Sequence, residues 1–171
     1  MKYEIVPTDN ENYQSELEDF NFNEPPIDPV ELAKDLHETM NALNGAGMAA
    51  NQVGLNHRVA VFATEPPLTM YNPKITYYNN EYKVEPEGCL TYPGLYVKIR
   101  RPDSIRVRWQ DENGEMQAHA FDYPMAKVIQ HEVDHLNGID FVERASKINL
   151  DVAKKKWKKL KSKFKKAGML K

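Results

Sequence analysis

Apolar positions recur at helical spacing in one early segment of the chain. Four of them share a single helix face, at intervals of three or four residues: Leu32, Leu36, Met40 and Leu43. Asp28 precedes this run as a suitable N-cap, Pro29 fits the first helical position, and Glu31 stands where a capping-box acid belongs. Gly45 follows the last apolar position and predicts the end of the helix. We therefore expect a helix from Pro29 to just before Gly45.

Short runs rich in β-branched and aromatic residues come next and predict strands: residues 59–62, 74–78, 96–100 and 104–110. In the last run, Ile105, Val107 and Trp109 alternate with charged or polar residues, which indicates a strand with one buried face. The pair Asn113-Gly114 is typical of a tight hairpin turn, so we expect an antiparallel return over residues 116–121.

A second helix is predicted to begin at Asp122 and Pro124 and to run to about Asn137, where Gly138 stops it. The strands cluster between the two helices and do not alternate with them. This order favours an α+β fold with antiparallel sheet over a parallel, doubly wound sheet. We assign no function to the acidic segment 11–24 and expect it to be a mobile loop.

The composition indicates the class of protein and its cellular compartment. A length of 171 residues with 41% hydrophobic residues fits one globular domain. No apolar run approaches the roughly 20 residues that span a bilayer, and the first six residues lack the apolar core of a secretory signal. The single cysteine excludes an internal disulfide and fits a reducing compartment. We expect a cytoplasmic monomer with no membrane partner.

Charge is distributed unevenly along the chain. Ten of the 23 basic residues lie after residue 150, against one of the 25 acidic residues, so the first 150 residues carry 13 basic and 24 acidic side chains and a net charge of −11. We expect a domain over residues 1–150 and a lysine-rich helix or tail over residues 151–171. In a helix, an apolar stripe would line one side of that tail: Ala153, Trp157, Leu160 and Phe164. The stripe favours packing onto the domain, while the lysines are also suited to a negatively charged partner such as ribosomal RNA.

The second predicted helix contains a metal-binding pattern, H-E-x-x-H, in Gln130-His-Glu-Val-Asp-His135. Four residues make a little more than one helical turn, so His131 and His135 project from the same face and can share one cation. Glu132 lies close enough to take a proton from a water molecule that the metal activates. The alternative is that the two histidines simply lie on a polar helix face and bind no metal.

A catalytic metal site needs a third protein ligand. No histidine follows His135, and Glu143 lies very close to the end of the helix. Cys89, in Glu87-Gly-Cys-Leu-Thr91, is the remaining strong candidate because a thiolate binds iron, zinc, nickel or cobalt well. A lone cysteine is more often a small buried residue, but the incomplete H-E-x-x-H site favours Cys89 as a ligand.

A run of small residues, Gly45-Ala-Gly-Met-Ala-Ala-Asn-Gln52, follows the first helix. It contains G-x-G-x-x-A, but a dinucleotide-binding fingerprint follows a strand and opens a helix, so this context argues against one. Small residues that end in an amide indicate backbone packed against a ligand, with Gln52 as a donor. A plain helix-to-strand turn is the alternative.

Together, and in this order, the three segments resemble the signature of the peptide deformylase family: G-x-G-x-A-A-x-Q, E-G-C-L-S and Q-H-E-x-D-H. Only Thr91 departs from it, since a serine is usual there; the hydroxyl is kept, and we expect activity to survive. The resemblance extends from about residue 29 to residue 144 and includes Pro93-Gly94 and Arg101. The first 25 residues and the lysine tail lie outside it.

The resemblance implies removal of the formyl group from the N-terminal methionine of nascent peptides, with release of formate. It implies Cys89, His131 and His135 as ligands of one divalent metal ion, usually Fe²⁺, with Zn²⁺, Ni²⁺ and Co²⁺ as alternatives. Carried over to this chain, the resemblance also implies Glu132 as general base and then general acid, Gln52 and the backbone N–H of Leu90 as oxyanion donors, and Gly45 and Gly47 as substrate contacts. The implied fold packs antiparallel sheets around a central H-E-x-x-H helix, with a basic C-terminal helix.

Two other functions stay open at this point. An H-E-x-x-H endopeptidase would take Glu143 or another residue as its third ligand in place of Cys89. A structural zinc site with an RNA-binding arm would need a fourth ligand, for which the candidates are His37, His57 and His119.

Overall fold

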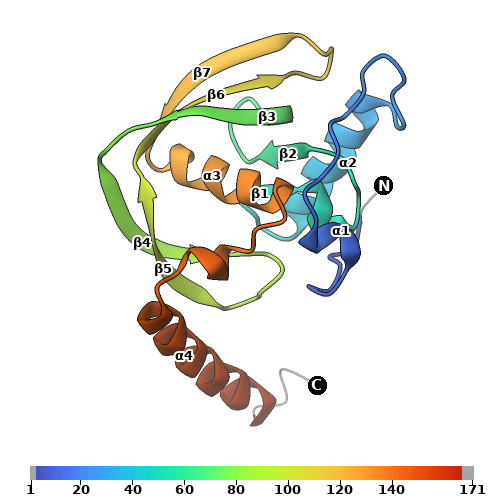
Figure 1. The fold of residues 1–171 in the computed structure, drawn as a ribbon. Coiled ribbons are helices and arrows are strands. Elements are labelled where there is room, and N and C mark those ends of the chain that lie inside the picture. The colour runs from blue at the N-terminus through green and yellow to red at the C-terminus, as the bar shows by residue number, and fades with distance from the viewer. Residues whose placement is uncertain (1–2, 167–171) are drawn as a thin grey trace.

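Antiparallel strands surround one central helix in the structure, a computed structural model that describes residues 3–166 (Figure 1). The helices are α1 (Glu11–Gln14), α2 (Pro29–Ala42), α3 (Met125–Leu136) and α4 (Lys147–Lys166), with two 3₁₀ turns, η1 (Ala50–Val53) and η2 (Phe141–Arg144). The strands are β1 (Gly47–Ala49), β2 (Val59–Phe62), β3 (Leu68–Tyr78), β4 (Tyr82–Gly88), β5 (Tyr96–Pro102), β6 (Ser104–Gln110) and β7 (Met116–Asp122). The predicted α+β class is confirmed.

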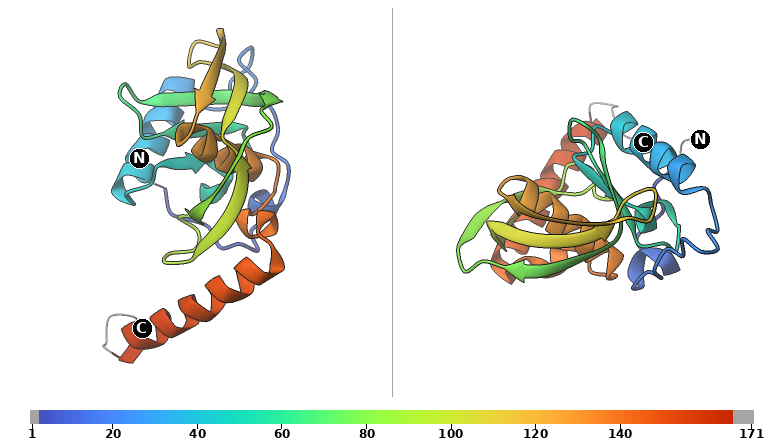
Figure 2. Two further views of the ribbon diagram at one scale, coloured as in Figure 1. Left: turned by 90° about the vertical axis from the view of Figure 1, so that its left-hand side faces the viewer. Right: turned by 90° about the horizontal axis from the view of Figure 1, so that it is seen from above.

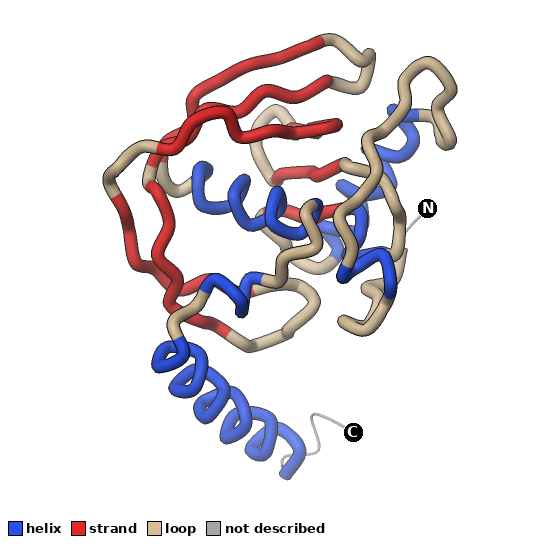
Figure 3. The backbone as a smooth tube through the Cα atoms, viewed as in Figure 1, coloured by secondary structure: helices blue, strands red, loops and turns tan. Residues whose placement is uncertain are grey.

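The strands form two antiparallel sheets around α3. One has five strands in the order β1-β2-β3-β6-β7, and the other is the β4-β5 pair. The helix that carries H-E-x-x-H lies between them, as the tube drawing shows (Figure 3). The predicted hairpin is present, with Ser104 opposite Asp122 and Gln110 opposite Met116. Strands β1 and β4 were not predicted from the sequence.

Helix α2 begins as predicted, because the Asp28 side chain accepts a hydrogen bond from the backbone N–H of Glu31. It ends at Ala42, and the residue that terminates it lies one position earlier than predicted. Asn44, not Gly45, adopts the left-handed conformation (φ 55°), and the N–H of Gly45 bonds to the carbonyl of Met40. This is a Schellman-type end, in which asparagine can replace glycine. Leu43 at the helix end is 43% exposed and does not complete the apolar stripe.

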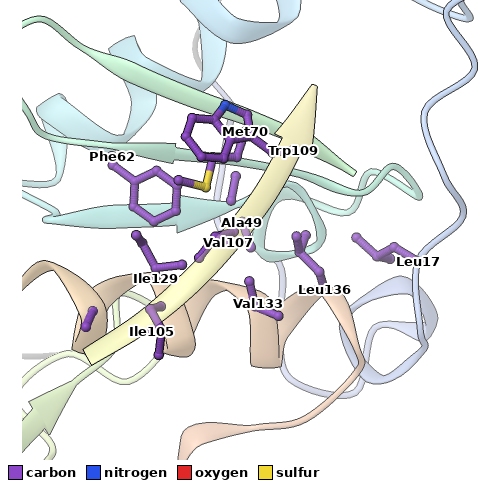
Figure 4. Packing of buried hydrophobic residues seen from close by; sticks show 12 residues of the cluster. Leu17, Ala49, Phe62, Met70, Ile105, Val107, Trp109, Ile129, Val133 and Leu136 are labelled. Carbon is purple, nitrogen blue, oxygen red and sulfur yellow. The ribbon is translucent and has the colours of Figure 1, made fainter. Parts of the chain in front are cut away.

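Alternation along β2 sends side chains to two different cores. Ala60 and Phe62 pack towards α3, whereas Val59 and Val61 belong to the cluster that contains the buried face of α2. The predicted apolar face of β6, formed by Ile105, Val107 and Trp109, also packs towards α3. Figure 4 shows these side chains beside the helix. Helix α3 is therefore covered on its sheet side by close-packed apolar side chains, and this packing fixes the helix in place.

The acidic N-terminal segment is held on the domain, so the expectation of a loop was wrong in part. Its residues 11–14 form α1, and Tyr13, Leu17 and Phe20 are buried. The N–H of Leu17 donates to the carbonyl of Leu136 at the end of α3 over 2.9 Å. The acidic residues between these apolar anchors hid them from the pattern search.

Helix α4 leaves the domain below β4 and β5, and its C-terminal half projects away from the rest of the molecule (Figure 2). Its Ala153 is buried in a cluster with Leu95, Val97 and Phe141, and Trp157 packs against this cluster. Leu160 is 40% exposed, so only the first part of the predicted apolar stripe is buried on the domain. The side chain of Phe164, the last member of the predicted stripe, lies outside the described residues. Among the described helices, none has the length and hydropathy needed to cross a membrane.

Candidate active site

The three predicted ligands meet at one place. His131 and His135 lie one turn apart on α3, and Cys89 follows the last residue of β4. Their ligand atoms, one sulfur and two imidazole nitrogens, all lie within 4.8 Å of one another. Cys89 Sγ lies 3.3 Å from His135 Nε2. This set of one soft sulfur and two nitrogens suits a divalent transition metal and leaves room for a fourth, non-protein ligand.

The orientation of His131 is set by a buried carboxylate. Its Nδ1 lies 3.1 Å from Glu87 Oε2, so the other ring nitrogen is turned towards Cys89. Glu87 is also held by Arg101, whose Nε and Nη2 donate to its two oxygens over 2.7 and 3.0 Å. Carboxylates that bond to the far nitrogen of a ligand histidine fix the ring and its tautomer.

A charged network continues from Arg101 across the back of α3. Arg101 Nη1 donates to Asp134 Oδ2 over 2.7 Å, and Arg144 donates to both oxygens of the same carboxylate over 3.0 and 2.6 Å. No role was predicted from the sequence for Glu87, Asp134 or Arg144. The available signal was that Glu87 and Asp134 stand inside two of the motifs, which is where buried partners of the ligands are expected.

The charges around His131 favour a cation at this point. Burial lowers the pKa of His131, but hydrogen bonds with Cys89 and Glu87 outweigh it and raise the pKa to about 10. Burial and the neighbouring His131 charge lower the pKa of His135. Burial would raise the pKa of Glu87, yet hydrogen bonds from His131 and Arg101 lower it to about 2. The negative charge of Glu87 that raises the pKa of His131 would also favour a metal cation on this ring once the proton has left.

Glu132 lies beside the donor set with one oxygen unpaired. Within residues 3–166, its Oε2 is one of two buried side-chain polar atoms that have no hydrogen-bond partner. Burial raises the pKa of its carboxyl to about 7. A β-carbon on Gly47 would lie 2.6 Å from Glu132 Oε1, so this strand position requires glycine for the carboxylate to fit. A carboxyl that titrates near neutral pH is suited to both taking and giving a proton.

Gln52 points its amide group at the same place. Its Oε1 accepts a hydrogen bond from the N–H of Ala49 over 2.9 Å, which turns the amide nitrogen towards Cys89 Sγ and Thr91 Oγ1, each at 3.3 Å. Gln52 is 1% exposed, so the amide is held in one orientation. Thr91 uses the hydroxyl that it shares with the serine usual at this position.

A cavity of about 670 Å³ opens onto these side chains. Its wall on one side is the segment that contains Gly45 and Gly47, and on the other side the segment from Gly88 through Leu90 to Tyr96. His131, Glu132 and Gln52 also line it. Seven of the eight residues predicted to act in catalysis or to bind metal or substrate therefore line one cavity, and the eighth, His135, is buried beside Cys89.

The N-terminal segment reaches this site from behind. The Tyr13 ring packs against His135 with centroids 5.5 Å apart, and its hydroxyl donates to Asp140. Asn51 donates its side-chain amide to the backbone carbonyls of Tyr13 and His135. These contacts place α1 behind the second histidine, a role that the sequence analysis did not foresee.

The alternative ligands lie elsewhere in the described part of the chain. Glu143 Oε1 accepts a hydrogen bond from the N–H of Asp140 at the start of η2. His37 bonds to Thr69, His57 packs on Phe20, and His119 packs on Trp109. None of them belongs to the group of donor atoms around Cys89.

Comparisons with known proteins agree with this geometry. A family model described as polypeptide deformylase matches residues 2–151. The match includes residues 2–25, so the expectation that the N-terminal segment lies outside the family resemblance was wrong. A peptide deformylase of Synechocystis is 46% identical over 119 residues, which are 66% of this chain and 64% of that protein. A peptide deformylase of Bartonella quintana is 39% identical over 75% of this chain and 76% of its own length.

Solved structures give the same fold. The peptide deformylase of Synechococcus elongatus in complex with actinonin aligns with a TM-score of 0.83 and 32% identity, over 90% of this chain and 86% of that chain. The Thermus thermophilus peptide deformylase aligns with a TM-score of 0.83 and 33% identity, over 96% and 98% of the two chains. The match spans about 60–64% of the length of the cyanobacterial relatives found first among curated proteins.

Proposed function

The chain belongs to the polypeptide deformylase family, and from this premise we propose that it removes the formyl group from the N-terminal methionine of newly made polypeptides. The reaction consumes one water molecule and yields formate and a free α-amine. The observation that carries the proposal is the group of Cys89, His131 and His135 beside a cavity that Glu132, with one unpaired carboxylate oxygen, also lines. The substrate at the ribosome implies a cytoplasmic enzyme.

Cys89, His131 and His135 would hold one divalent metal ion, with Fe²⁺ proposed first and Zn²⁺, Ni²⁺ or Co²⁺ as alternatives. The metal would supply Lewis acidity to water and to the formyl oxygen. Glu87 would keep the His131 ring in place through the bond to Nδ1, and Arg101 would keep Glu87 ionised.

Glu132 would move the proton. Its carboxylate takes one from the attacking water and then delivers it to the leaving amine nitrogen, since a pKa of about 7 permits both steps near neutral pH. Gln52 Nε2 and the backbone N–H of Leu90 would donate to the formyl oxygen as negative charge develops there. One such donor typically lowers the barrier by about 3–4 kcal/mol.

The segment from Gly45 to Gly47 would bind the substrate backbone. Strand β1 is an edge strand that pairs with β2 on one side, and its other edge belongs to the cavity side of the molecule. An extended peptide can add to such an edge through main-chain hydrogen bonds. The same cavity is the proposed site for actinonin in this chain, by analogy with the Synechococcus elongatus complex.

Formate release from formyl-Met-Ala tests the proposal. The protein is purified without oxygen, loaded with Fe²⁺ and assayed with and without a chelator, beside Glu132→Ala as the matched inactive control. We expect release by the loaded wild type alone. A folded, metal-loaded wild type that releases no formate would overturn the proposal.

The lysine face of α4 supports a second part of the proposal, attachment to ribosomal RNA. Nine described lysines on this helix are exposed: Lys147, Lys154, Lys155, Lys156, Lys158, Lys159, Lys161, Lys163 and Lys165. Exposed lysines can neutralise RNA backbone phosphates, and such binding weakens steeply with salt. Changing Lys154, Lys155, Lys158 and Lys159 to glutamine should reduce pelleting with ribosomes at low salt. Equal pelleting of the variant and the wild type would exclude this contact.

A further inference from the structure

The segment from Tyr92 to Tyr96 is a wall of the cavity, and its shape depends on one turn. Pro93 and Gly94 occupy the centre of this turn, which is closed by a 3.0 Å hydrogen bond from the N–H of Leu95 to the carbonyl of Tyr92. Gly94 has φ of +80°, which with proline before it is typical of a type II turn. All five residues, 92–96, line the cavity.

The hydrogen bond from Leu95 to Tyr92 closes the turn but does not fix the orientation of the peptide group between Pro93 and Gly94. Type I and type II turns differ by a flip of that central peptide, which reverses the direction of its carbonyl. In this structure the Pro93 carbonyl accepts a hydrogen bond from Trp157 Nε1 over 2.9 Å. An indole from α4 therefore holds the one peptide whose orientation decides the turn type.

Helix α4 also packs against the turn. A β-carbon on Gly94 would lie 3.8 Å from Trp157 Nε1 and 3.7 Å from Leu160 Cδ2, which is ordinary van der Waals distance. Lys161 Nζ lies 3.6 Å from the Trp157 ring centroid on the solvent side and helps to hold the indole. The apolar cluster of Trp157 extends through Tyr92 to Cys89 itself.

The helix is anchored to the domain independently of Trp157. Ala153 is 7% exposed in the cluster with Val97 and Ile99, and Asn149 Nδ2 donates to the Lys98 carbonyl over 3.0 Å. A change at Trp157 therefore leaves α4 attached to β5 and acts at the turn.

We propose that Trp157 is a positioning residue for substrate binding, which holds the wall 92–96 of the cavity through the Pro93 carbonyl. The inference rests on the proposed function, because it assumes that the substrate occupies this cavity. The loss of one hydrogen bond of this kind typically changes an equilibrium by about 2- to 10-fold. The effect falls on substrate affinity, because Trp157 touches the wall and none of the reacting groups.

The kinetic test compares Trp157→Phe, which keeps a ring and removes the donor, with Val152→Ala on the exposed side of the same helix. Trp157→Phe should raise KM for formyl-Met-Ala about 2- to 10-fold at unchanged kcat, metal content and melting temperature, whereas Val152→Ala should change none of them. An unchanged KM, or an equal fall in kcat, would overturn the inference while leaving the proposed function intact. A wild type that releases no formate would overturn both.

Indole fluorescence gives a readout that does not depend on turnover. The chain has two tryptophans, and Trp109 is buried in the α3 core, away from the wall. Saturation of the loaded protein with the product peptide Met-Ala should change the emission of the wild type, and this change should be lost in Trp157→Phe. A change of equal size in both proteins would assign the signal to Trp109 and count against a contact between Trp157 and the occupied cavity.

Discussion

Replacing Gly47 with alanine tests whether the position of the Glu132 carboxylate controls the reaction. The added methyl carbon would lie 2.6 Å from Glu132 Oε1 and 2.9 Å from its Cγ. Gly47 is itself held, since β1 pairs with β2 with Gly47 opposite Phe62. The strand cannot withdraw easily, so the carboxylate must move.

The size of the effect follows from these distances. Ordinary van der Waals contact begins at 3.4 Å, so the carboxylate oxygen must shift by about 0.8 Å. A misplacement near 1 Å costs roughly 100-fold in rate, and we expect about that loss in kcat. Overpacking of a buried site should lower the free energy of unfolding by about 1–3 kcal/mol. Metal content should stay unchanged, because the three atoms nearest to the added methyl group all belong to Glu132 and not to a ligand.

The assay is a double-mutant cycle with Glu132→Ala. Formate release, metal stoichiometry and urea unfolding are measured for the wild type, both single variants and the double variant. With the carboxylate removed, the methyl group on residue 47 meets no obstacle, so Gly47→Ala should cost little further activity or stability. Equal losses from Gly47→Ala in both backgrounds would refute the argument, because the effect would then act through some other contact.

Glu132→Ala alone should keep its metal and lose about 10²- to 10⁴-fold in kcat; a metal-replete variant with near-normal kcat would exclude Glu132 as the proton carrier. Cys89→Asp should weaken or change metal binding, measured as stoichiometry and affinity, and unchanged values would count against the thiolate as a ligand. Arg101→Ala leaves Glu87 and Asp134 buried with fewer partners, so urea unfolding should show a loss of about 3–5 kcal/mol. Because the pKa of Glu87 is lowered from 4.5 to about 2, its contribution of roughly 3 kcal/mol is present above pH 4.5 and is lost as the pH falls towards 2. Glu87→Gln should remove this acid dependence from the unfolding curve, and a persistent dependence would assign it to other groups.

Local sequence patterns predicted those helices and strands whose own residues show a cap, an apolar stripe or strict alternation. Helix α2 has a cap and an apolar stripe, and β6 alternates strictly, so both were found with their bounds nearly correct. Strand β4 was missed because Glu87, its one buried side chain, is charged, and Val84 is 54% exposed. Its stability as a strand comes from pairing with β5 along its whole length, which no local pattern contains.

The metal ligands were recognised from their motifs, but the residues that hold these ligands in place were not. The spacing of two histidines on a helix is a local property, whereas Arg101 reaches Glu87 and Asp134 only after β5 has paired with β4 and both have packed on α3. The contacts of Trp157 with Pro93 likewise join residues 64 positions apart in the chain. Contacts of this kind form only through tertiary packing, so no local sequence pattern predicts them.

Helix α3 links stability to chemistry because it serves both at once. Ile129, Val133 and Leu136 pack in the core against the five-stranded sheet, while His131 and His135 face Cys89 from the same short helix. A rotation or shift of α3 that repacked the core would therefore move both imidazoles with respect to the sulfur. The buried bonds of Arg101 to Glu87 and Asp134 oppose such a movement, because they tie the helix to β4 and β5 on its other side. Core packing and the charged network thus hold the donor set from opposite sides, so a variant that weakens either one should loosen metal binding before it unfolds the domain.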